Sequence, residues 1–192
     1  MPGQVRPVAD ERDALLAYLA QMRSVITLAA YGLTDSQARA TPSVSPLSVG
    51  GLIKHVASTE RGWIDIVLQE PSGSQDDYET NFRLLEGETL AEVIAGYEQV
   101  AARTEDVIAG IADLDQPVPV PRGVPWFPQD VDAWSVRWVL LHLIQETARH
   151  AGHADIVREH IDGATAFPLM AAAEGWPETP WMKPWKLDTQ PA

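Results

Sequence analysis

The sequence predicts an all-α fold: an antiparallel four-helix bundle with long connections and a C-terminal tail rich in tryptophan and proline. Four segments of about 20 residues or more repeat their apolar side chains at helical spacing, which is typical of amphipathic bundle helices. No segment shows the sustained apolar–polar alternation that marks strands. A chain of 192 residues with 45% hydrophobic residues can bury one sizeable core. We therefore expect a single domain over residues 1–192.

The first two predicted helices are followed by residues that favour a helix end. The first helix runs from about residue 10 to residue 31, and Gly32 follows it at a position suited to a left-handed cap. The second helix runs from about residue 48 to residue 70. Pro71 ends it, because proline cannot continue a helix. His55 lies in the apolar stripe of this second helix, so we expect its side chain to face the other helices.

The third and fourth helices also carry terminal signals. The third runs from about residue 89 to residue 112, and Thr89 with Glu92 resembles a capping box. The fourth runs from about residue 135 to residue 161, and Gly163 follows its end.

Two connections and the tail are unusual for a bundle. Residues 71–88 and 113–130 form connections longer than bundle loops commonly are, and the second contains five prolines and Trp126. Long connections often carry function, and this second one leads directly into the fourth helix. We expect the tail, residues 164–192, to pack on the bundle, because three exposed tryptophans would form an aggregation-prone patch.

Composition excludes several classes of function. The net charge of −13 is spread along the chain and would repel phosphate backbones, so we expect no nucleic-acid partner. No window approaches 18 uninterrupted apolar residues, and the N-terminus has no apolar signal region, so we expect no membrane span and no secretory signal. The chain has no cysteine, which removes disulfides and thiolate metal sites and is compatible with the cytoplasm.

Four of the five histidines lie between His142 and His160, in the fourth predicted helix. At about 100° per residue, these four and Glu146 fall within roughly one quarter of the helix circumference. His160 lies ten residues beyond His150, a rise of about 15 Å, and cannot share a site with it. Without His160, the candidate site on this helix face consists of His142, Glu146, His150 and His153.

We interpret this face as part of a metal site. Glu146 and His150 are four residues apart, so their Cβ atoms lie about 6 Å apart and their side chains can share one cation. His55 from the second helix would add a second imidazole. Two histidines, one carboxylate and an open position are typical of catalytic zinc and related divalent sites. Two alternatives stay open: a solvated, hydrogen-bonded helix face, and metal-free acid–base catalysis by a His–Glu pair.

Two further residues are candidates for a substrate pocket. Arg149 lies beside the histidine face and could bind a substrate carboxylate, or pair with an acidic residue of a neighbouring helix. Trp138 could form a wall of the pocket together with Trp134, although core packing is the more common role of such tryptophans.

The second and fourth helices resemble a known family. The stretches SVGGLIKHVASTERGW and HLIQETARHAGHADIVRE are similar to the DinB-like superfamily of metalloproteins, and within it to an actinobacterial subgroup. Helix order, the proline-rich connection and the tryptophan-containing tail extend the resemblance over most of the chain. The resemblance implies a DinB-like four-helix bundle that forms homodimers and holds a divalent metal between its second and fourth helices.

Carried over residue by residue, the resemblance implies His55, Glu146 and His150 as metal ligands. Many members have histidine where this chain has Glu146. Two histidines and one glutamate are similar to the ligands of mycothiol-dependent maleylpyruvate isomerases. His142 and His153 are alternative ligands, or partners that orient the ligands and water from outside the metal shell.

The resemblance also implies a reaction type. We expect a metal-dependent transferase or isomerase that uses a low-molecular-weight thiol such as mycothiol and acts on a small molecule. Zinc is the first expectation for the metal, with nickel, iron or manganese as alternatives. Two other functions stay open: a hydrolase in which the same metal activates water, and a bundle that binds a metal or ligand without catalysis.

Overall fold

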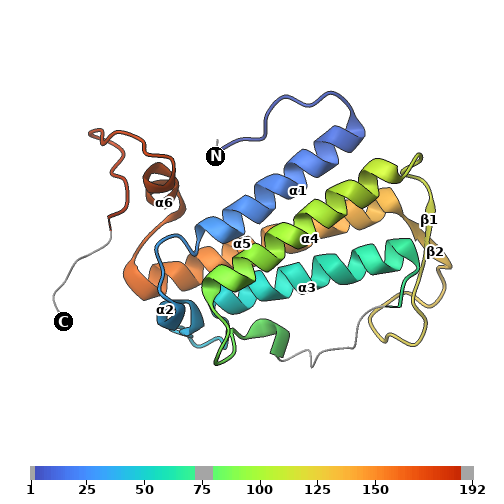
Figure 1. Ribbon diagram of the computed structural model, residues 1–192, viewed down its shortest axis with the longest axis horizontal. Helices are drawn as coiled ribbons and strands as arrows, with labels where there is room; N and C mark the ends of the chain where they lie inside the picture. The colour runs from blue at the N-terminus through green and yellow to red at the C-terminus, as the bar shows by residue number, and fades with distance from the viewer. Residues whose placement is uncertain (1–2, 72–79, 187–192) are drawn as a thin grey trace.

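The computed structural model describes residues 3–71 and 80–186. Within these residues the protein is mostly helical, with six α-helices, one 3-10 helix and one small two-stranded sheet (Figure 1). The elements in chain order are α1 (Glu11–Leu28), α2 (Asp35–Arg39), α3 (Val49–Leu68), η1 (Thr80–Phe82), α4 (Leu90–Gly110), β1 (Pro117–Pro119), β2 (Ala133–Ser135), α5 (Val136–Asp162) and α6 (Ala166–Ala173).

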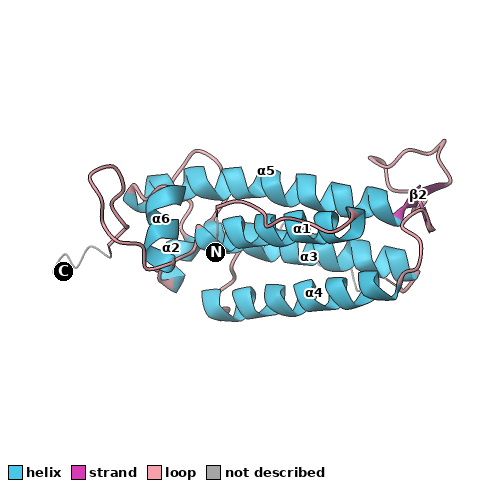
Figure 2. Cartoon of the chain, turned by 90° about the horizontal axis from the view of Figure 1, so that it is seen from above, coloured by secondary structure: helices cyan, strands magenta, loops and turns pink. Residues whose placement is uncertain are grey.

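Four long helices, α1, α3, α4 and α5, pack side by side (Figures 1 and 2). Helices α1 and α5 run in the same direction. Near their starts, Arg137 of α5 donates to Glu11 of α1 at 2.6 Å, and near their ends Arg158 donates to the carbonyl of Ala29 at 2.8 Å. The prediction of antiparallel helices is therefore wrong for this neighbouring pair.

Helices α3 and α4 are also parallel to each other. Lys54 in the first half of α3 lies 2.7 Å from Glu88, which immediately precedes the α4 cap, and Arg103 late in α4 lies 2.7 Å from Asp65 late in α3. Helix α4 thus begins at the end of the molecule where α3 begins, which is why the connection over 71–88 is long (Figure 1).

Helices α3 and α5 run antiparallel, as predicted. Trp63 late in α3 contacts Trp138 early in α5, and His55 earlier in α3 lies near Glu146 further along α5. This crossing brings the second and fourth predicted helices together, so it decides which side chains can share a site.

The helix ends follow the local chemistry of the sequence. Thr89 and Glu92 form the predicted capping box at the start of α4, and Gly163 ends α5 in the left-handed conformation with φ of 74°. Helix α3 ends earlier than predicted, at a left-handed Gln69 with φ of 56°, before Pro71 is reached. Helix α1 is also shorter than predicted and ends at Leu28.

Strands β1 and β2 were not predicted from the sequence. They pair antiparallel, with Val118 opposite Trp134, and so join the beginning of the connection at 113–130 to the residues directly before α5. Each strand has only three residues, which is too short for an alternating pattern to be recognised. This pairing fixes both ends of the segment that contains Trp126.

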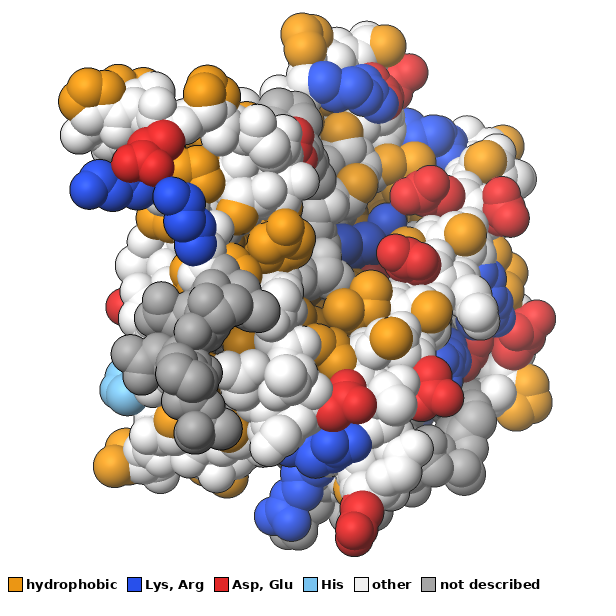
Figure 3. Space-filling view, turned by 60° about the vertical axis from the view of Figure 1, so that its left-hand side comes forward, with side chains coloured by type: hydrophobic (Ala, Val, Ile, Leu, Met, Phe, Trp, Pro, Cys, Tyr) orange, Lys and Arg blue, Asp and Glu red, His pale blue; other side chains and the backbone are white. Residues whose placement is uncertain are grey.

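Acidic, basic and apolar side chains are interspersed on the molecular face shown in Figure 3, at the end of the molecule that carries α6. Among the described residues of this face, the basic side chains do not gather into one patch. No helix within residues 3–71 and 80–186 is long and apolar enough to cross a membrane.

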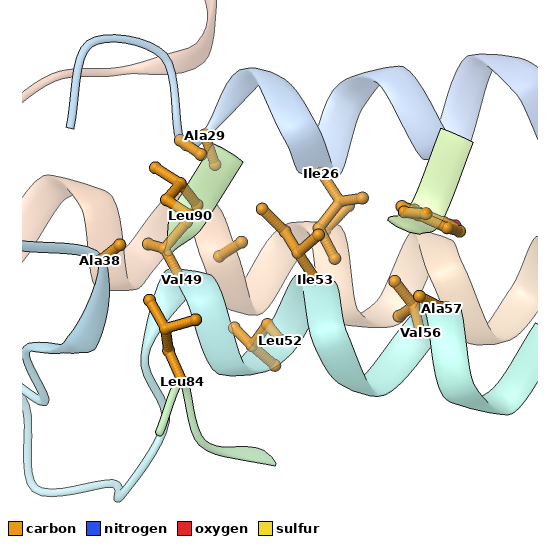
Figure 4. Close-up of a cluster of buried hydrophobic side chains, with 14 of the residues drawn as sticks. Ile26, Ala29, Ala38, Val49, Leu52, Ile53, Val56, Ala57, Leu84 and Leu90 are labelled. Carbon is orange, nitrogen blue, oxygen red and sulfur yellow. The ribbon is translucent and has the colours of Figure 1, made fainter. Parts of the chain in front are cut away.

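The core near the start of α3 is closed by short segments that the sequence did not predict. Ala38 of α2 and Leu84, just after η1, pack against Val49 and Leu52 of α3 (Figure 4). Gly51 permits this approach, since a Cβ atom there would lie 1.9 Å from the carbonyl oxygen of the last residue of η1. The glycine therefore allows η1 to lie directly on α3.

The tail packs in part. Trp185 lies edge-on to Tyr31 with ring centroids 6.0 Å apart, and the guanidinium carbon of Arg158 lies 4.9 Å from the centroid of the Trp185 ring. Trp181, by contrast, is 79% exposed, so the expectation that all the tail tryptophans pack is wrong for this residue.

Candidate metal centre and adjoining pocket

Three metal-binding side chains converge between α3 and α5. His55 comes from α3, and Glu146 and His150 come from consecutive turns of α5. One donor atom from each lies within 4.8 Å of the others. Oε1 of Glu146 is 3.1 Å from Nε2 of His150 and 3.5 Å from Nε2 of His55. The structure thus brings together the three residues that the sequence singled out as ligands.

Two of these separations match the donor spacing around one divalent cation, and the donor atoms of the third pair, His55 and His150, lie within 4.8 Å of each other. Donor atoms bound tetrahedrally at about 2.0–2.1 Å from a metal lie about 3.3 Å from one another. The distances from Glu146 to His150 and to His55 lie on either side of that value. Two imidazole nitrogens and one carboxylate oxygen form a donor set suited to zinc, nickel, iron or manganese.

The three groups are withdrawn from water to different degrees. The residues His55 and His150 are 7% and 9% exposed, whereas Glu146 is half-buried. Hydrogen bonding to His150, and secondly to His55, holds the pKa of Glu146 well below its usual range despite burial. Glu146 is therefore a carboxylate at neutral pH, the form that binds a cation.

An aromatic ring that sequence reasoning missed covers the site. Phe82 stacks on the His55 ring with centroids 3.8 Å apart and an interplanar angle of 18°, and its centroid lies 5.9 Å from that of His150. Phe82 belongs to η1, far from both helices in sequence. The one local signal is Gly51, whose missing side chain lets the Phe82 backbone approach.

The neighbouring histidines lie outside the three-residue cluster. Nδ1 of His153 is 3.4 Å from Nδ1 of His150, on the side of that ring away from Glu146. His142 stacks on Trp138 with centroids 5.2 Å apart and planes 5° apart. His153 thus contacts a candidate ligand, whereas His142 belongs to an aromatic stack.

A cavity of about 710 Å³ adjoins the cluster. Its lining combines groups of the candidate metal site with aromatic rings from α3, α5 and the connection at 113–130: His55, Thr59, Trp63, Trp126, Phe127, His142 and Glu146. Trp126 is 76% exposed, so the cavity opens to solvent on that side.

The two predicted pocket residues do not line this cavity. Arg149 is exposed on α5. Trp138 lies behind the lining, stacked between His142 and Trp134, and its centroid is 5.4 Å from that of Trp63. Trp126 and Phe127 line the cavity instead of the two predicted residues. The sequence indicated that their connection was functional but not which of its residues would reach the site.

A family model described as mycothiol-S-transferase matches residues 14–163. The chain belongs to the mycothiol-S-transferase family. This finding confirms the resemblance to the DinB-like superfamily. A comparison with curated proteins gave no match.

Among solved structures, a conserved protein from Enterococcus faecalis is similar to this mycothiol-S-transferase family member. The two share 16% sequence identity with a TM-score of 0.63, and the match covers 82% of this chain and 100% of the other. At this identity the likeness concerns the fold alone.

The family match spans the whole candidate site. Residues 14–163 run from the first turn of α1 to the cap of α5, and therefore include the convergent His55, Glu146 and His150 as well as the cavity residue Trp126. The whole tail, residues 164–192, lies beyond the mycothiol-S-transferase match.

Proposed function

We propose that this protein is a divalent-metal-dependent thiol transferase that joins the sulfur of mycothiol, or of a similar low-molecular-weight thiol, to a small electrophile. The observation that carries the proposal is the convergence of His55, Glu146 and His150 beside an open cavity of about 710 Å³. Membership of the mycothiol-S-transferase family supports the choice of thiol.

His55, Glu146 and His150 would hold the metal, with zinc as the first choice. A divalent cation at this position would stabilise the anion of a thiol and so make it a nucleophile near neutral pH. Glu146 supplies the negative charge of the donor set. Hydrogen bonds from the two imidazoles lower the pKa of Glu146, so the carboxylate is ionised at neutral pH, and each imidazole would release its Nε2 proton when a cation binds.

The surrounding residues hold the donor set in place. Phe82 lies flat on His55 and limits the rotation of that ring, and Thr59 Oγ1 lies 3.5 Å from His55 Nε2. His153 faces Nδ1 of His150 and can accept the proton of that nitrogen in a hydrogen bond, which would leave the lone pair of His150 Nε2 for the bound cation. We therefore assign His153 an orienting role.

The cavity determines where the reactants and products go. A sulfur–carbon bond forms as the thiol attacks the electrophilic carbon, and a displaced leaving group departs with the electron pair of its broken bond. The thiol proton passes to solvent through the side of the cavity where Trp126 is exposed. In an addition to an activated double bond no group leaves, and a proton is bound by the product instead.

The first test is metal content. Protein purified without a His tag and without chelators should contain, or take up, about one divalent ion per chain, and a His55→Ala variant should not. A His160→Ala variant is the matched control, because His160 is exposed and interacts with the carbonyl of Ile156, outside the cluster. Thiol-dependent conjugation by the loaded protein would then support the transferase. Turnover that does not depend on thiol would replace it with a hydrolase, and failure to bind metal would refute both.

For the whole chain we propose a single domain, residues 1–192, with the DinB-like four-helix bundle as its fold. We further propose that it forms a homodimer in the cytoplasm. Large apolar side chains are exposed along α5 at Trp138, Leu141 and Ile156, and a second copy would cover such a surface. Sedimentation analysis of the purified protein would test this assembly, since a monomer at all concentrations would contradict it.

A further inference from the structure

The cavity beside the candidate metal centre has an aromatic wall. Trp63 of α3 is buried, and Phe127 packs on it with centroids 5.7 Å apart. Trp126 lies edge-on to Phe127 at 6.2 Å and is exposed at the cavity mouth. Three of the seven lining residues thus present flat apolar rings, which favour a flat apolar partner.

The turn that carries Trp126 and Phe127 is held by hydrogen bonds. The amide of Phe127 donates to the carbonyl of Val124 at 3.1 Å. The side-chain amide of Gln129 donates to the carbonyls of Val124 and Phe127 at 3.2 Å and 2.8 Å. These bonds define the backbone of the turn while Trp126 is still exposed to water, so the indole projects from a preformed element. A ligand that stacked on it would bury apolar surface that is now hydrated.

The charge of the cavity restricts the ligand as well. Glu146 is the one acidic residue among the described residues that line it, and neither lysine nor arginine is present in that lining. Arg149, which the sequence suggested as a carboxylate-binding residue, lies outside it. A substrate carboxylate would therefore find no guanidinium or ammonium partner in this lining, and the cation of the proposed function would already be bound by the thiolate, so the carboxylate would lose hydration without compensation.

From this combination we infer that the electrophile is an uncharged molecule with a flat aromatic or conjugated ring, held by Trp126 and Phe127 beside Trp63. The inference rests on the proposed function for the thiol and for the reacting carbon. Trp126 and Phe127 determine which electrophile binds. The candidate ligands, by contrast, would hold the same metal whichever electrophile is bound.

Binding of two unreactive probes tests the inference separately from catalysis. The probes are 1,3-dinitrobenzene, which is flat and neutral, and 3,5-dinitrobenzoate, which adds a carboxylate to the same ring. Titration calorimetry on the full chain, both as purified and after chelation, would give their Kd values. We expect the neutral probe to bind at least about 10-fold more tightly than the benzoate, since a buried unpaired carboxylate is costly.

Variants locate the binding to the turn. Trp126→Ala and Phe127→Ala should each weaken binding of the neutral probe about 3- to 10-fold, the effect of losing one aromatic contact. Trp181→Ala is the matched control, because Trp181 is equally exposed but lies in the tail, and it should leave the Kd unchanged. Far-ultraviolet circular dichroism should be the same for Trp126→Ala and Trp181→Ala, since both removed indoles are exposed, and it tests whether the fold tolerates loss of the partly buried Phe127 ring.

Several outcomes would overturn the inference. These are equal or tighter binding of the benzoate, unchanged binding in both turn variants, or binding of a neutral sugar such as methyl glucoside in place of the dinitrobenzene, which would assign the aromatic wall to a sugar ligand. Metal uptake is measured in parallel. Ring binding by a protein that takes up no metal even on reconstitution would refute the proposed function alone. Metal-dependent thiol turnover without ring selectivity would refute this inference alone.

Discussion

Phe82 lies face to face with the imidazole of His55, with ring centroids 3.8 Å apart and planes inclined by 18°. The contact joins a 3-10 turn to the middle of α3, and the carbonyl of Phe82 meets α3 at the position of Gly51. Because the ring covers one face of a candidate metal ligand, the geometry of the candidate centre depends on a residue that binds no metal itself.

Gly51→Ala should therefore destabilise the protein. The new Cβ would lie 1.9 Å from the carbonyl oxygen of Phe82, so η1 must move. We expect a loss of about 1–3 kcal/mol in the free energy of unfolding, as for overpacking in a core. Gly62→Ala in the same helix is the control, because nothing lies within 4 Å of its Cβ position, and it should gain up to about 1 kcal/mol from helix propensity. Urea unfolding of both variants measures this, and equal midpoints would contradict the argument.

Glu60 should be indispensable to the core although it takes no part in the candidate site. It is fully buried, lies 2.6 Å from Nη2 of Arg23 and 2.5 Å from the hydroxyl of Thr104. Glu60→Ala leaves a buried guanidinium without its main partner, so we expect a loss of about 3–5 kcal/mol.

The exposed partner of the same arginine provides the control for that variant. Glu105 also pairs with Arg23, at 3.0 Å, but its side chain is half exposed. Glu105→Ala should cost less than about 1 kcal/mol. Denaturant midpoints of the two variants compare them directly, and a similar loss in both would show that burial does not decide the effect.

His153 and His142 should differ in their effect on metal binding. His153 contacts His150, so His153→Ala should weaken zinc affinity about 10- to 100-fold while the stoichiometry at saturation stays the same. His142 stacks on Trp138 instead, so His142→Ala should leave the zinc affinity unchanged. Competition with a chromogenic chelator gives both affinities. Complete loss of metal from either variant would make that histidine a ligand.

Asp155 should make stability depend on pH. Burial, with a smaller contribution from Glu159, raises the pKa of the Asp155 carboxyl above its ordinary value of 3.8. The folded protein therefore holds this proton more tightly than the unfolded chain, and stability falls as pH rises through the folded pKa. Asp155→Asn should be more stable than the parent at neutral pH, and the difference should shrink as the pH falls toward about 4.

Thermal unfolding across that pH range tests the prediction for Asp155. Asp106→Asn serves as the control, because Asp106 is exposed on α4. A gain in stability that is constant with pH, or the same in both variants, would contradict the assignment.

The long helices could be predicted because their signals are local. Thr89 and Gly163 mark helix ends through contacts within a few residues, and apolar spacing marks the faces. The parallel course of neighbouring helices could not be predicted, since it depends on contacts such as Arg158 with Ala29, 129 positions apart. Residue type and i,i+4 spacing were enough to select Glu146 and His150.

The residues missed around the site belong to segments without periodicity. Phe82 lies in a three-residue turn and Trp126 in a proline-rich connection, and tertiary contacts alone bring them to the cavity. Spacing along α5 made Trp138 a candidate for the pocket, with core packing as the favoured alternative, and its neighbours Trp134 and His142 hold it behind the lining. Spacing along one helix gives the face of a side chain but not what covers that face.

The separation of His55 from Glu146, 91 positions along the chain, has a consequence for biosynthesis. A ribosome-bound chain exposes His55 before the fourth long helix is made, so the nascent protein has only one of the three candidate ligands of the proposed site. Helices α1 and α3 would then begin to fold without a bound ion. The proposed site could bind a cation only after α5 has left the ribosome and packed against α1 and α3. Truncated products that end before α5 would lack Glu146 and His150 and could not form the proposed site.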